Sequence, residues 1–446
     1  MVKCSNHQSG YGSSAIASMT LLFMILATAS AARVAVVGGG ASGYFAAISA
    51  ARSGGAGVVL LEGTRKPLKK VLASGGGRCN VMHDPALPVP DFVERYPRGS
   101  RELRGPYTKV FGPEDAKAWF EAEGVTLKTE ADGRVFPVTD DARTVADALT
   151  RAADAAGVDV RAGDAVTAID ALGDGGFAVS AGGETLACDA VVLATGSSPS
   201  GYTLAASLGH EPVRPYPSLF SFRVPRSPLD GLAGLSLADA ALDLAAAGKK
   251  KHRKSPQRGP LLVTHRGVSG PAALKLSAFL ARELKDAGYR GELRLDALPS
   301  SSPGAVRDAV LSYRRTNPKK AARTRGPFSE IPRRLWARYC DHAAFPDDAN
   351  WADVSEKKAE ALAAALKALP LAFDGKDTNK DEFVTAGGVC LKEVDMRTFE
   401  SKKVPGLHVT GELLDVDGVT GGFNFMNCWC SGYAAGASAA ARAGGA

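Results

Sequence analysis

Three glycines near the start of the chain have the spacing of a nucleotide-binding turn. Gly38, Gly40 and Gly43 follow the apolar run 33–37 and open an alanine-rich helix candidate at residues 44–52. In a Gly-x-Gly-x-x-Gly turn the first glycine permits the bend, the second lets the backbone approach a diphosphate, and the third lets the helix pack on the strand. The helix start also offers free N–H groups to phosphate. The pattern predicts dinucleotide binding.

A carboxylate follows at the distance that such a turn requires. The apolar run 57–61 ends in Glu62, 19 residues beyond Gly43. A side chain at this position accepts hydrogen bonds from the hydroxyls of an adenosine ribose. The chain has 50 glycines, so the glycine pattern alone is weak evidence. Strand, turn, helix and spaced acid in this order make it strong.

A second strand-and-turn signal lies near the other end of the chain. Residues 406–411 form an apolar run that ends in Gly411 and Glu412, and a small-residue helix candidate starts near Gly422 and continues to Ala441. The carboxylate can hold the polyol of a flavin, and the helix N-terminus can direct its dipole at the N1/C2=O edge of the ring. An ordinary strand–turn–helix whose glycines serve close packing is the alternative.

Composition and cysteine spacing give no support for small domains stabilised by disulfides or zinc. The chain has 446 residues, enough for two or three domains, and its 45% hydrophobic and 23% charged residues are ordinary for a globular protein. Its seven cysteines never occur as Cys-x-x-Cys. The spacing supports neither a disulfide framework nor a zinc site, and we expect no bound metal.

The first 32 residues resemble a targeting segment. Lys3 is their only formally charged residue, an apolar core spans 15–27, and the sequence at 29–31 fits a cleavage site. The core is short for a membrane span. We expect an organelle or secretory-route address and no stable membrane span in the mature chain. An uncleaved anchor or a misassigned start codon is the alternative.

Further along the chain, the hydrophobic pattern alternates between short strands and helices as far as about residue 212. This alternation predicts an α/β layered domain. Residues 64–80 read as a basic, glycine-rich loop, residues 125–138 as a hairpin, and residues 142–156 as a helix.

The pattern changes after residue 212. Runs at 215–224, 261–264 and 291–295 predict strands of a smaller antiparallel unit, and residues 303–370 predict helices. Strand-like runs typical of the first part return after residue 377. The simplest organisation is a targeting segment and a nucleotide-binding domain that is interrupted by an insertion. The predicted boundaries are 1–32, 33–212, 213–376 and 377–446.

Several stretches also carry a family resemblance, in order from about residue 33 to 440. They are 38–43, 74–80, 134–137, 194–196, 264–271, 385–389, 411–418 and 421–424. Together they resemble the BaiN/RdsA-type flavoproteins, which are NAD(P)/FAD-dependent oxidoreductases also described as aminoacetone-oxidase-like. The resemblance implies an α/β fold: a Rossmann-like FAD-binding domain interrupted by an inserted small β-barrel and helical subdomain. The chain departs from the pattern at 426–430 and in a basic insertion at 249–258.

On this resemblance, the glycine turn holds the pyrophosphate of FAD and Glu62 holds the adenosine ribose. Arg78 offers charge to phosphate, and the backbone near Val166 meets the adenine edge. The predicted cofactor-binding set is Gly38, Gly40, Ala41, Ser42, Gly43, Glu62, Arg78, Cys79, Asn80, Val166, Thr195, Gly196, Gly411, Glu412, Gly421, Gly422, Phe423 and Asn424.

Two residues are candidates for proton transfer. His265 has a side chain whose pKa range suits protonation of a carbanion or enolate. Cys79 is the second candidate, by analogy with flavin-dependent uridine reductases. A structural role is the alternative for each.

The expected activity is that of a flavin reductase. NAD(P)H reduces FAD, and hydride then passes from the flavin N5 to an activated C=C bond. A second hypothesis is an RNA-modifying enzyme that reduces a uridine of rRNA to dihydrouridine, with basic segments 249–258 and 314–338 contacting the phosphates. A third is a flavin oxidase that returns electrons to oxygen. The substrate is therefore a small molecule or RNA.

Overall fold

The computed structural model describes residues 34–444 except 55–56, 226, 246–254 and 378–383. The predicted targeting segment and most of the basic insertion at 249–258 lie outside the described residues. Within the described ranges, no helix has the length and hydropathy of a membrane span.

A parallel sheet forms the centre of the first domain. Its strands are β1 (Val34–Val37), β2 (Val58–Glu62), β6 (Asp159–Ala162), β10 (Ala190–Leu193) and β22 (Leu407–Val409), in the order β22-β10-β1-β2-β6. Two short antiparallel strands, β20 (Val394–Asp395) and β21 (Glu400–Ser401), extend one edge. The inner strands β1 and β10 are buried along their whole length.

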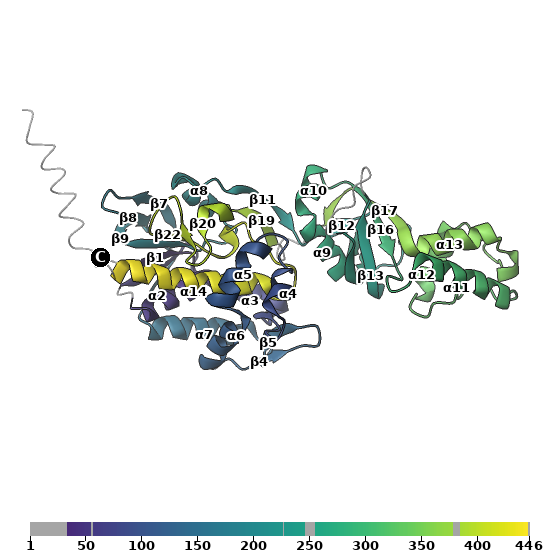
Figure 1. The fold of residues 1–446 in the computed structure, drawn as a ribbon, viewed down its shortest axis with the longest axis horizontal. Coiled ribbons are helices and arrows are strands. Elements are labelled where there is room, and N and C mark those ends of the chain that lie inside the picture. Colours follow the sequence, from purple (N-terminus) through teal and green to yellow (C-terminus); the bar gives the residue numbers. More distant parts are fainter. Residues whose placement is uncertain (1–33, 55–56, 226, 246–254, 378–383, 445–446) are drawn as a thin grey trace, which may run out of the picture.

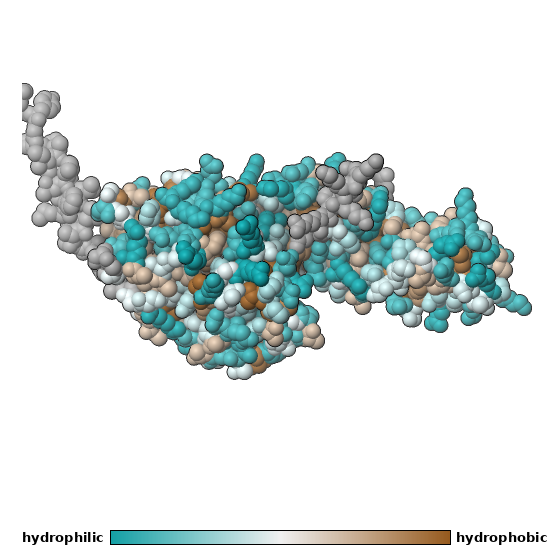
Figure 2. All heavy atoms as spheres, viewed as in Figure 1, coloured by the Kyte–Doolittle hydropathy of each residue, from teal (hydrophilic) through white to brown (hydrophobic). Residues whose placement is uncertain are grey.

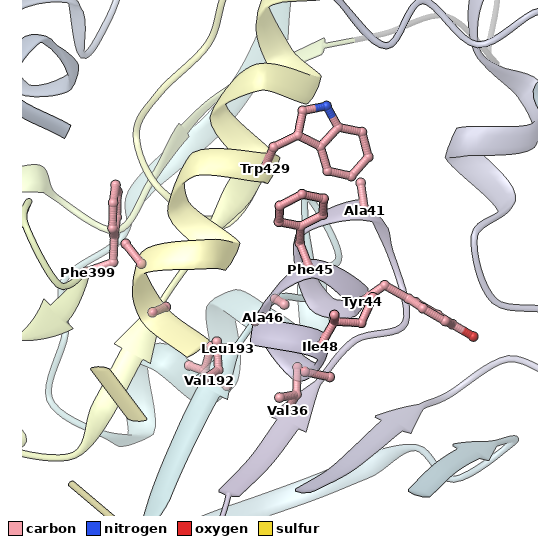
Figure 3. Packing of buried hydrophobic residues seen from close by; sticks show 14 of the residues in the cluster. Val36, Ala41, Tyr44, Phe45, Ala46, Ile48, Val192, Leu193, Phe399 and Trp429 are labelled. Atoms are coloured by element: carbon pink, nitrogen blue, oxygen red, sulfur yellow. The ribbon is translucent and has the colours of Figure 1, made fainter. Parts of the chain in front are cut away.

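Two helices from opposite ends of the sequence pack side by side on this sheet. They are α2 (Ala41–Arg52), directly after β1, and α14 (Phe423–Gly444), as Figure 1 shows. Phe45 and Trp429 meet between them with ring centroids 5.1 Å apart (Figure 3). Ser49 Oγ donates to the Tyr433 carbonyl at 2.8 Å. Small residues on both helices permit this close approach, which joins the two ends of the chain in one core.

Smaller elements surround the parallel sheet. One three-stranded sheet pairs β3 (Met82–His83), β5 (Arg134–Pro137) and β4 (Leu127–Thr129), and another pairs β7 (Val166–Ala171), β8 (Phe177–Ala181) and β9 (Glu184–Cys188). The helices are α3 (Lys69–Gly77), α4 (Val89–Val93), α5 (Ser100–Lys109), α6 (Pro113–Ala122), α7 (Ala142–Ala155) and α8 (Pro199–Ser207).

The middle of the chain forms a second sheet of seven strands. Their order is β17 (Leu369–Phe373), β16 (Gly291–Asp296), β13 (Ser236–Leu244), β14 (Gln257–Val263), β15 (Gly267–Ser269), β12 (Ser221–Arg223) and β18 (Gly375–Asp377). The edge strands β17 and β18 are separated in sequence only by Asp374. The two edges must therefore lie close together, which gives the sheet the curl of a small barrel.

Helices cover and extend this second sheet. Helices α9 (Pro271–Phe279) and α10 (Ala281–Asp286) pack beside it, and α11 (Pro303–Thr316), α12 (Arg333–His342) and α13 (Glu356–Ala368) form the far tip of the elongated molecule (Figure 1). The sheet and these helices share a hydrophobic core that is separate from the core around the parallel sheet.

A narrow junction connects the two cores. Strand β11 (Val213–Ser218) pairs with β19 (Val384–Gly388), outside both large sheets. Arg98 forms an ion pair with the buried carboxylate of Asp417 and donates to the Ala278 carbonyl of α9 at 3.1 Å. A charged pair therefore ties the first domain to the second sheet at this point.

The structure corrects two local predictions. The run 215–224 is not one strand, because the backbone adopts a positive φ of 56° at Leu219 and the chain passes there from β11 to β12. Residues 64–80 are not all loop, because α3 begins at Lys69. Its backbone leaves the helical conformation at Ser74–Gly76, where two glycines have positive φ.

Candidate functional site

The glycine turn lies at the carboxyl end of β1, in the middle of the parallel sheet. Gly38 has a φ of +112°, and a Cβ there would lie 2.5 Å from the Ala194 carbonyl oxygen of the neighbouring strand end. A Cβ on Gly43 would collide with the Gly38 carbonyl. In contrast, a Cβ on Gly40 would meet no atom within 4 Å. Gly38 and Gly43 thus shape the turn, while Gly40 leaves open space before α2.

Glu62 ends β2 beside this turn. One carboxylate oxygen accepts a hydrogen bond from Gly39 N at 2.7 Å, and the other accepts one from Thr64 N at 2.8 Å. Val166 begins β7 next to Ala165, whose Cβ would lie 3.3 Å from a Cβ on Gly63. The structure therefore brings the predicted ribose-binding acid and the predicted adenine-edge segment to the same end of the sheet.

The C-terminal signal reaches the same edge. Gly411 follows β22 with a φ of +63°, and a Cβ there would lie 2.6 Å from Ser42 Oγ of the glycine turn. Glu412 is half-buried beside Gly196, which follows β10 with a φ of +59°. The two predicted motifs, more than 360 positions apart in the sequence, thus meet in space.

These residues fit a bound dinucleotide. The Thr195 hydroxyl at the end of β10 is buried and has no hydrogen-bond partner in the described part of the chain. The first turn of α2 carries no acidic side chain to repel phosphate. Open space at Gly40, unpaired N–H groups at the helix start, and carboxylates on either side match a diphosphate flanked by two polyols.

The turn before α14 is held in a fixed shape by its own residues. The Asn424 side chain binds both Gly418 N at 2.7 Å and Gly418 O at 3.1 Å. A Cβ on Gly422 would collide with the Met82 backbone. In the amide orientation that satisfies both its atoms, Asn80 accepts from Gly422 N at 3.0 Å and donates to the Met82 carbonyl at 3.0 Å. The 74–80 loop and the Gly421–Gly422 turn are therefore one unit.

Phe423 belongs to the core rather than to an open surface. Its ring is buried and packs edge-on against Phe92 at 4.9 Å, and its carbonyl accepts a hydrogen bond from the Tyr96 hydroxyl at 2.5 Å. Of the predicted 421–424 segment, the side chains of Phe423 and Asn424 thus serve packing and turn geometry. The helix N-terminus remains the part that can face a ligand.

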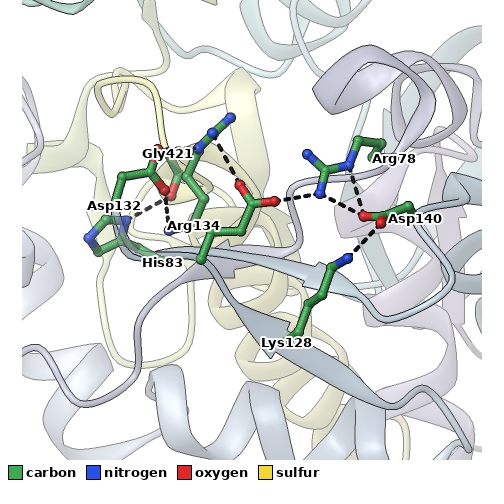
Figure 4. A network of polar contacts seen from close by, with 8 residues as sticks. Arg78, His83, Lys128, Asp132, Arg134, Asp140 and Gly421 are labelled. Atoms are coloured by element: carbon green, nitrogen blue, oxygen red, sulfur yellow. Dashed lines mark hydrogen bonds and ion pairs between the residues drawn. The ribbon is translucent and has the colours of Figure 1, made fainter. Parts of the chain in front are cut away.

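Arg78 is engaged in a network of alternating charges (Figure 4). Its guanidinium pairs with Glu130 at 2.5 Å and with Asp140 at 2.6 Å, and it lies over the Phe136 ring at 4.0 Å. Lys128 completes the series by pairing with Asp140 at 2.5 Å. These partners hold Arg78 against the β4–β5 hairpin, so its charge is already compensated within the fold.

The two candidates for proton transfer lie in different domains. Cys79 is fully buried at a positive φ of 59°, and burial raises the pKa of its thiol to about 12. It therefore stays a neutral thiol without access to solvent. His265 is exposed in the turn between β14 and β15. Strand β15 separates His265 from α9, which begins only at Pro271.

His265 also lies at the wrong end of its hairpin to approach the junction. Ser269, at the opposite end of β15, bonds Ser221 Oγ at 2.6 Å, only three residues from the junction strand β11. The structure thus brings Ser269 toward the first domain and leaves His265 away from it. The catalytic roles of His265 and Cys79 stay predictions, and the positions of both weigh against them.

Sequence reasoning missed two residues beside the site. Lys70 Nζ donates to Glu412 Oε2 at 2.6 Å, a partner 342 positions away. His83 Nδ1 lies 3.2 Å from the Gly421 carbonyl, its ring stacks on Phe423, and burial lowers its pKa. Lys70 stands in a basic run whose composition is typical of solvated loops, so no local signal separated it from its neighbours. Among the described residues, no cluster of His, Cys, Asp and Glu could hold a metal ion.

Comparisons with known proteins agree with this geometry. The model of the HI0933-like protein Rossmann domain matches residues 32–438. A 3-dehydro-bile acid Δ(4,6)-reductase from Clostridium scindens is 32% identical over 397 residues, which cover 87% of this chain and 93% of that protein. A ribosomal RNA dihydrouridine synthase from Escherichia coli is 27% identical over 389 residues, 85% of this chain and 91% of that protein.

Among solved structures, a 3-ketosteroid-Δ4-(5α)-dehydrogenase from Rhodococcus jostii matches with a TM-score of 0.49 and 16% identity, over 93% of this chain and 98% of that one. The family follows from the sequence matches, because the matched region takes in both halves of the glycine-lined edge. The chain belongs to the HI0933-like Rossmann family and is a flavin-dependent oxidoreductase.

Proposed function

We propose that the protein reduces an activated C=C bond of a small molecule, with FAD as cofactor and NAD(P)H as electron source. The observation that carries this proposal is the meeting of the Gly38–Gly43 turn, Glu62 and Gly411–Glu412 at one edge of the parallel sheet. The relative that is 32% identical reduces a bile-acid C=C bond and matches over nearly its whole length, which supports the same class of reaction here.

Each part of this edge has a role in holding the cofactor. The N–H groups at the start of α2 bind the diphosphate, and the Glu62 carboxylate accepts from the adenosine ribose. Glu412 would accept from the ribityl chain of the flavin, and the N-terminus of α14 would stabilise negative charge on its ring. The bound flavin supplies hydride transfer, which no amino-acid side chain can perform.

The test starts with cofactor identification. The purified chain should carry a flavin absorption spectrum, and the cofactor released by heat should be FAD. Under anaerobic conditions, NADPH or NADH should bleach this spectrum, and a 3-oxo-Δ4,6 bile acid should restore it with one equivalent of reduced product. Gly43→Ala is the cofactor-free control, because its Cβ would collide with the Gly38 carbonyl.

The outcomes separate the alternatives. A chain that takes up no FAD would refute the proposal as a whole. A reduced flavin that reacts with oxygen to give peroxide, but with no C=C substrate, would indicate an oxidase instead.

A second candidate function is reduction of a uridine in rRNA. Two relatives are ribosomal RNA dihydrouridine synthases. The visible face of the tip formed by α11–α13 carries hydrophilic side chains among paler and more hydrophobic ones (Figure 2). Basic side chains exposed in this part are Arg315, Lys319, Lys320, Arg325 and Arg333. Others of the predicted segment are bound within the fold: Arg314, Arg323, Arg334 and Arg338.

Charge removal tests this alternative. A variant with Arg315, Lys319, Arg325 and Arg333 changed to glutamine should bind rRNA more weakly and with a shallower salt dependence, since each phosphate contact adds about one to the slope. Exposed arginines of α5 in the first domain provide the control when changed in the same way. Equal loss in both variants, or none in either, would argue against an RNA substrate.

A further inference from the structure

Lys70 reaches across the edge of the sheet at which the cofactor motifs meet. It lies in α3, after β2, yet its Nζ donates to Glu412 Oε2, beyond β22, at 2.6 Å and to Ser197 Oγ, beyond β10, at 3.0 Å. Leu68 N, at the start of α3, donates to Gly39 O at 2.9 Å, so this helix begins against the glycine turn, and Glu412 and Ser197 follow the strands β22 and β10 on the other side of β1. The side chain therefore crosses the end of the sheet in front of the turn.

With the cofactor bound, this edge of the sheet would carry several negative charges, which a nearby cation would stabilise. The cofactor's diphosphate carries about two negative charges, and the flanking residues Glu62 and Glu412 are both acids. The first turn of α2 contributes only the partial positive charge of its N–H groups, because none of its residues is basic. Arg78, the cation that the sequence suggested, is paired with Glu130 and Asp140.

We propose that Lys70 binds the diphosphate of the dinucleotide, and that Glu412 and Ser197 orient the Lys70 side chain for this contact. This inference rests on the cofactor named in the proposed function. An ammonium group is a compact point charge that suits phosphate oxygens. The Lys70 side chain is 65% exposed, so it can turn toward the diphosphate without disturbing the core. Its contact with Glu412 also keeps that carboxylate from repelling the phosphates.

The test compares Lys70→Met with Lys69→Met, which removes the same charge from the neighbouring exposed position. Affinities for FAD, ADP, riboflavin and adenosine are measured by calorimetry or by quenching of flavin fluorescence. Because hydrogen bonds to charged groups contribute more than neutral ones, Lys70→Met should weaken ADP and FAD binding by about 10- to 100-fold. Adenosine and riboflavin, which lack phosphate, should bind as they do to the wild-type chain.

Two further measurements sharpen the result. Lys70→Arg should recover most of the ADP affinity, because it restores the charge. ADP binding to the wild-type chain should weaken with added salt more steeply than binding to Lys70→Met. These readouts do not depend on turnover, so they test Lys70 apart from the reaction.

Failure of this inference is distinguishable from failure of the proposed function. If the wild-type chain binds neither FAD nor ADP, the cofactor itself is wrong. If the wild-type chain binds both and Lys70→Met binds ADP equally well, Lys70 does not contact the diphosphate. An equal loss in Lys69→Met would also overturn the inference, because the effect would then be one of general charge.

Discussion

The contact between α2 and α14 provides a sharp test of how the two ends of the chain form one site. At Gly432 in α14, an added Cβ would lie 2.6 Å from the Ser42 carbonyl oxygen, 3.0 Å from Phe45 Cβ and 3.2 Å from Ala46 N. All three atoms belong to α2, and two of them are backbone. No side-chain rotation relieves this contact, so Gly432→Ala must push the helices apart.

The magnitude follows from two opposing effects. Overpacking of a well-packed core costs about 1–3 kcal/mol, whereas alanine in place of glycine within a helix gains about 1 kcal/mol. The control is Gly444→Ala on the same helix, where an added Cβ would meet nothing within 4 Å. Gly444→Ala lacks the packing cost, so the two variants should differ by about 1–3 kcal/mol. For a domain of this size, that corresponds to about 2–12 °C in Tm.

Thermal unfolding followed by circular dichroism measures this difference. Gly432→Ala should also weaken FAD binding, because Ser42 belongs to the turn that we propose to bind the diphosphate. If Gly432→Ala and Gly444→Ala melt at the same temperature with equal FAD affinity, the close helix contact does not position the site, and the reasoning fails.

Three further changes test other parts of the fold. Arg98→Met leaves the fully buried Asp417 carboxylate without its charged partner and should lower the free energy of unfolding by about 3–5 kcal/mol, measured by urea titration. A decrease below about 1 kcal/mol would show that the junction pair contributes little. Burial lowers the pKa of His408 to about 4, so the folded chain binds fewer protons than the unfolded one, and stability present above about pH 6.5 is lost as pH falls toward 4. His408→Leu should flatten that loss in urea titrations between pH 7 and 4, and an unchanged slope would contradict the assignment. His265→Ala should lower kcat by less than about threefold, since a general acid contributes about 100-fold or more, and a larger loss would restore His265 as the proton donor.

Local patterns in the sequence were sufficient to predict the elements around the glycine turn. Residues 33–62 carry strand, turn, helix and acid within one short stretch, and the structure has β1, α2 and β2 there. The hairpin at 125–138 and the helix from residue 142 were likewise predicted, because their hydrophobic periods and turn residues are local. The α/β fold class and the family are confirmed by the match over residues 32–438.

Partner choice, in contrast, depends on the tertiary structure. The run 215–224 has a continuous strand pattern, yet half of it pairs with β19 and half with β15 and β18, which come from distant parts of the chain. Arg78 lies in a glycine-rich basic run that is typical of a phosphate-binding loop. In the folded chain, however, its guanidinium pairs with Glu130 and Asp140. Nothing in the local sequence distinguishes Lys70 from a solvated lysine. Its contact with Glu412 forms only because β22 brings that residue to the same edge of the sheet. Periodicity and glycine spacing act over a few residues, so the sequence by itself determines which elements form. Which charges meet is decided only when the folded chain brings distant segments together.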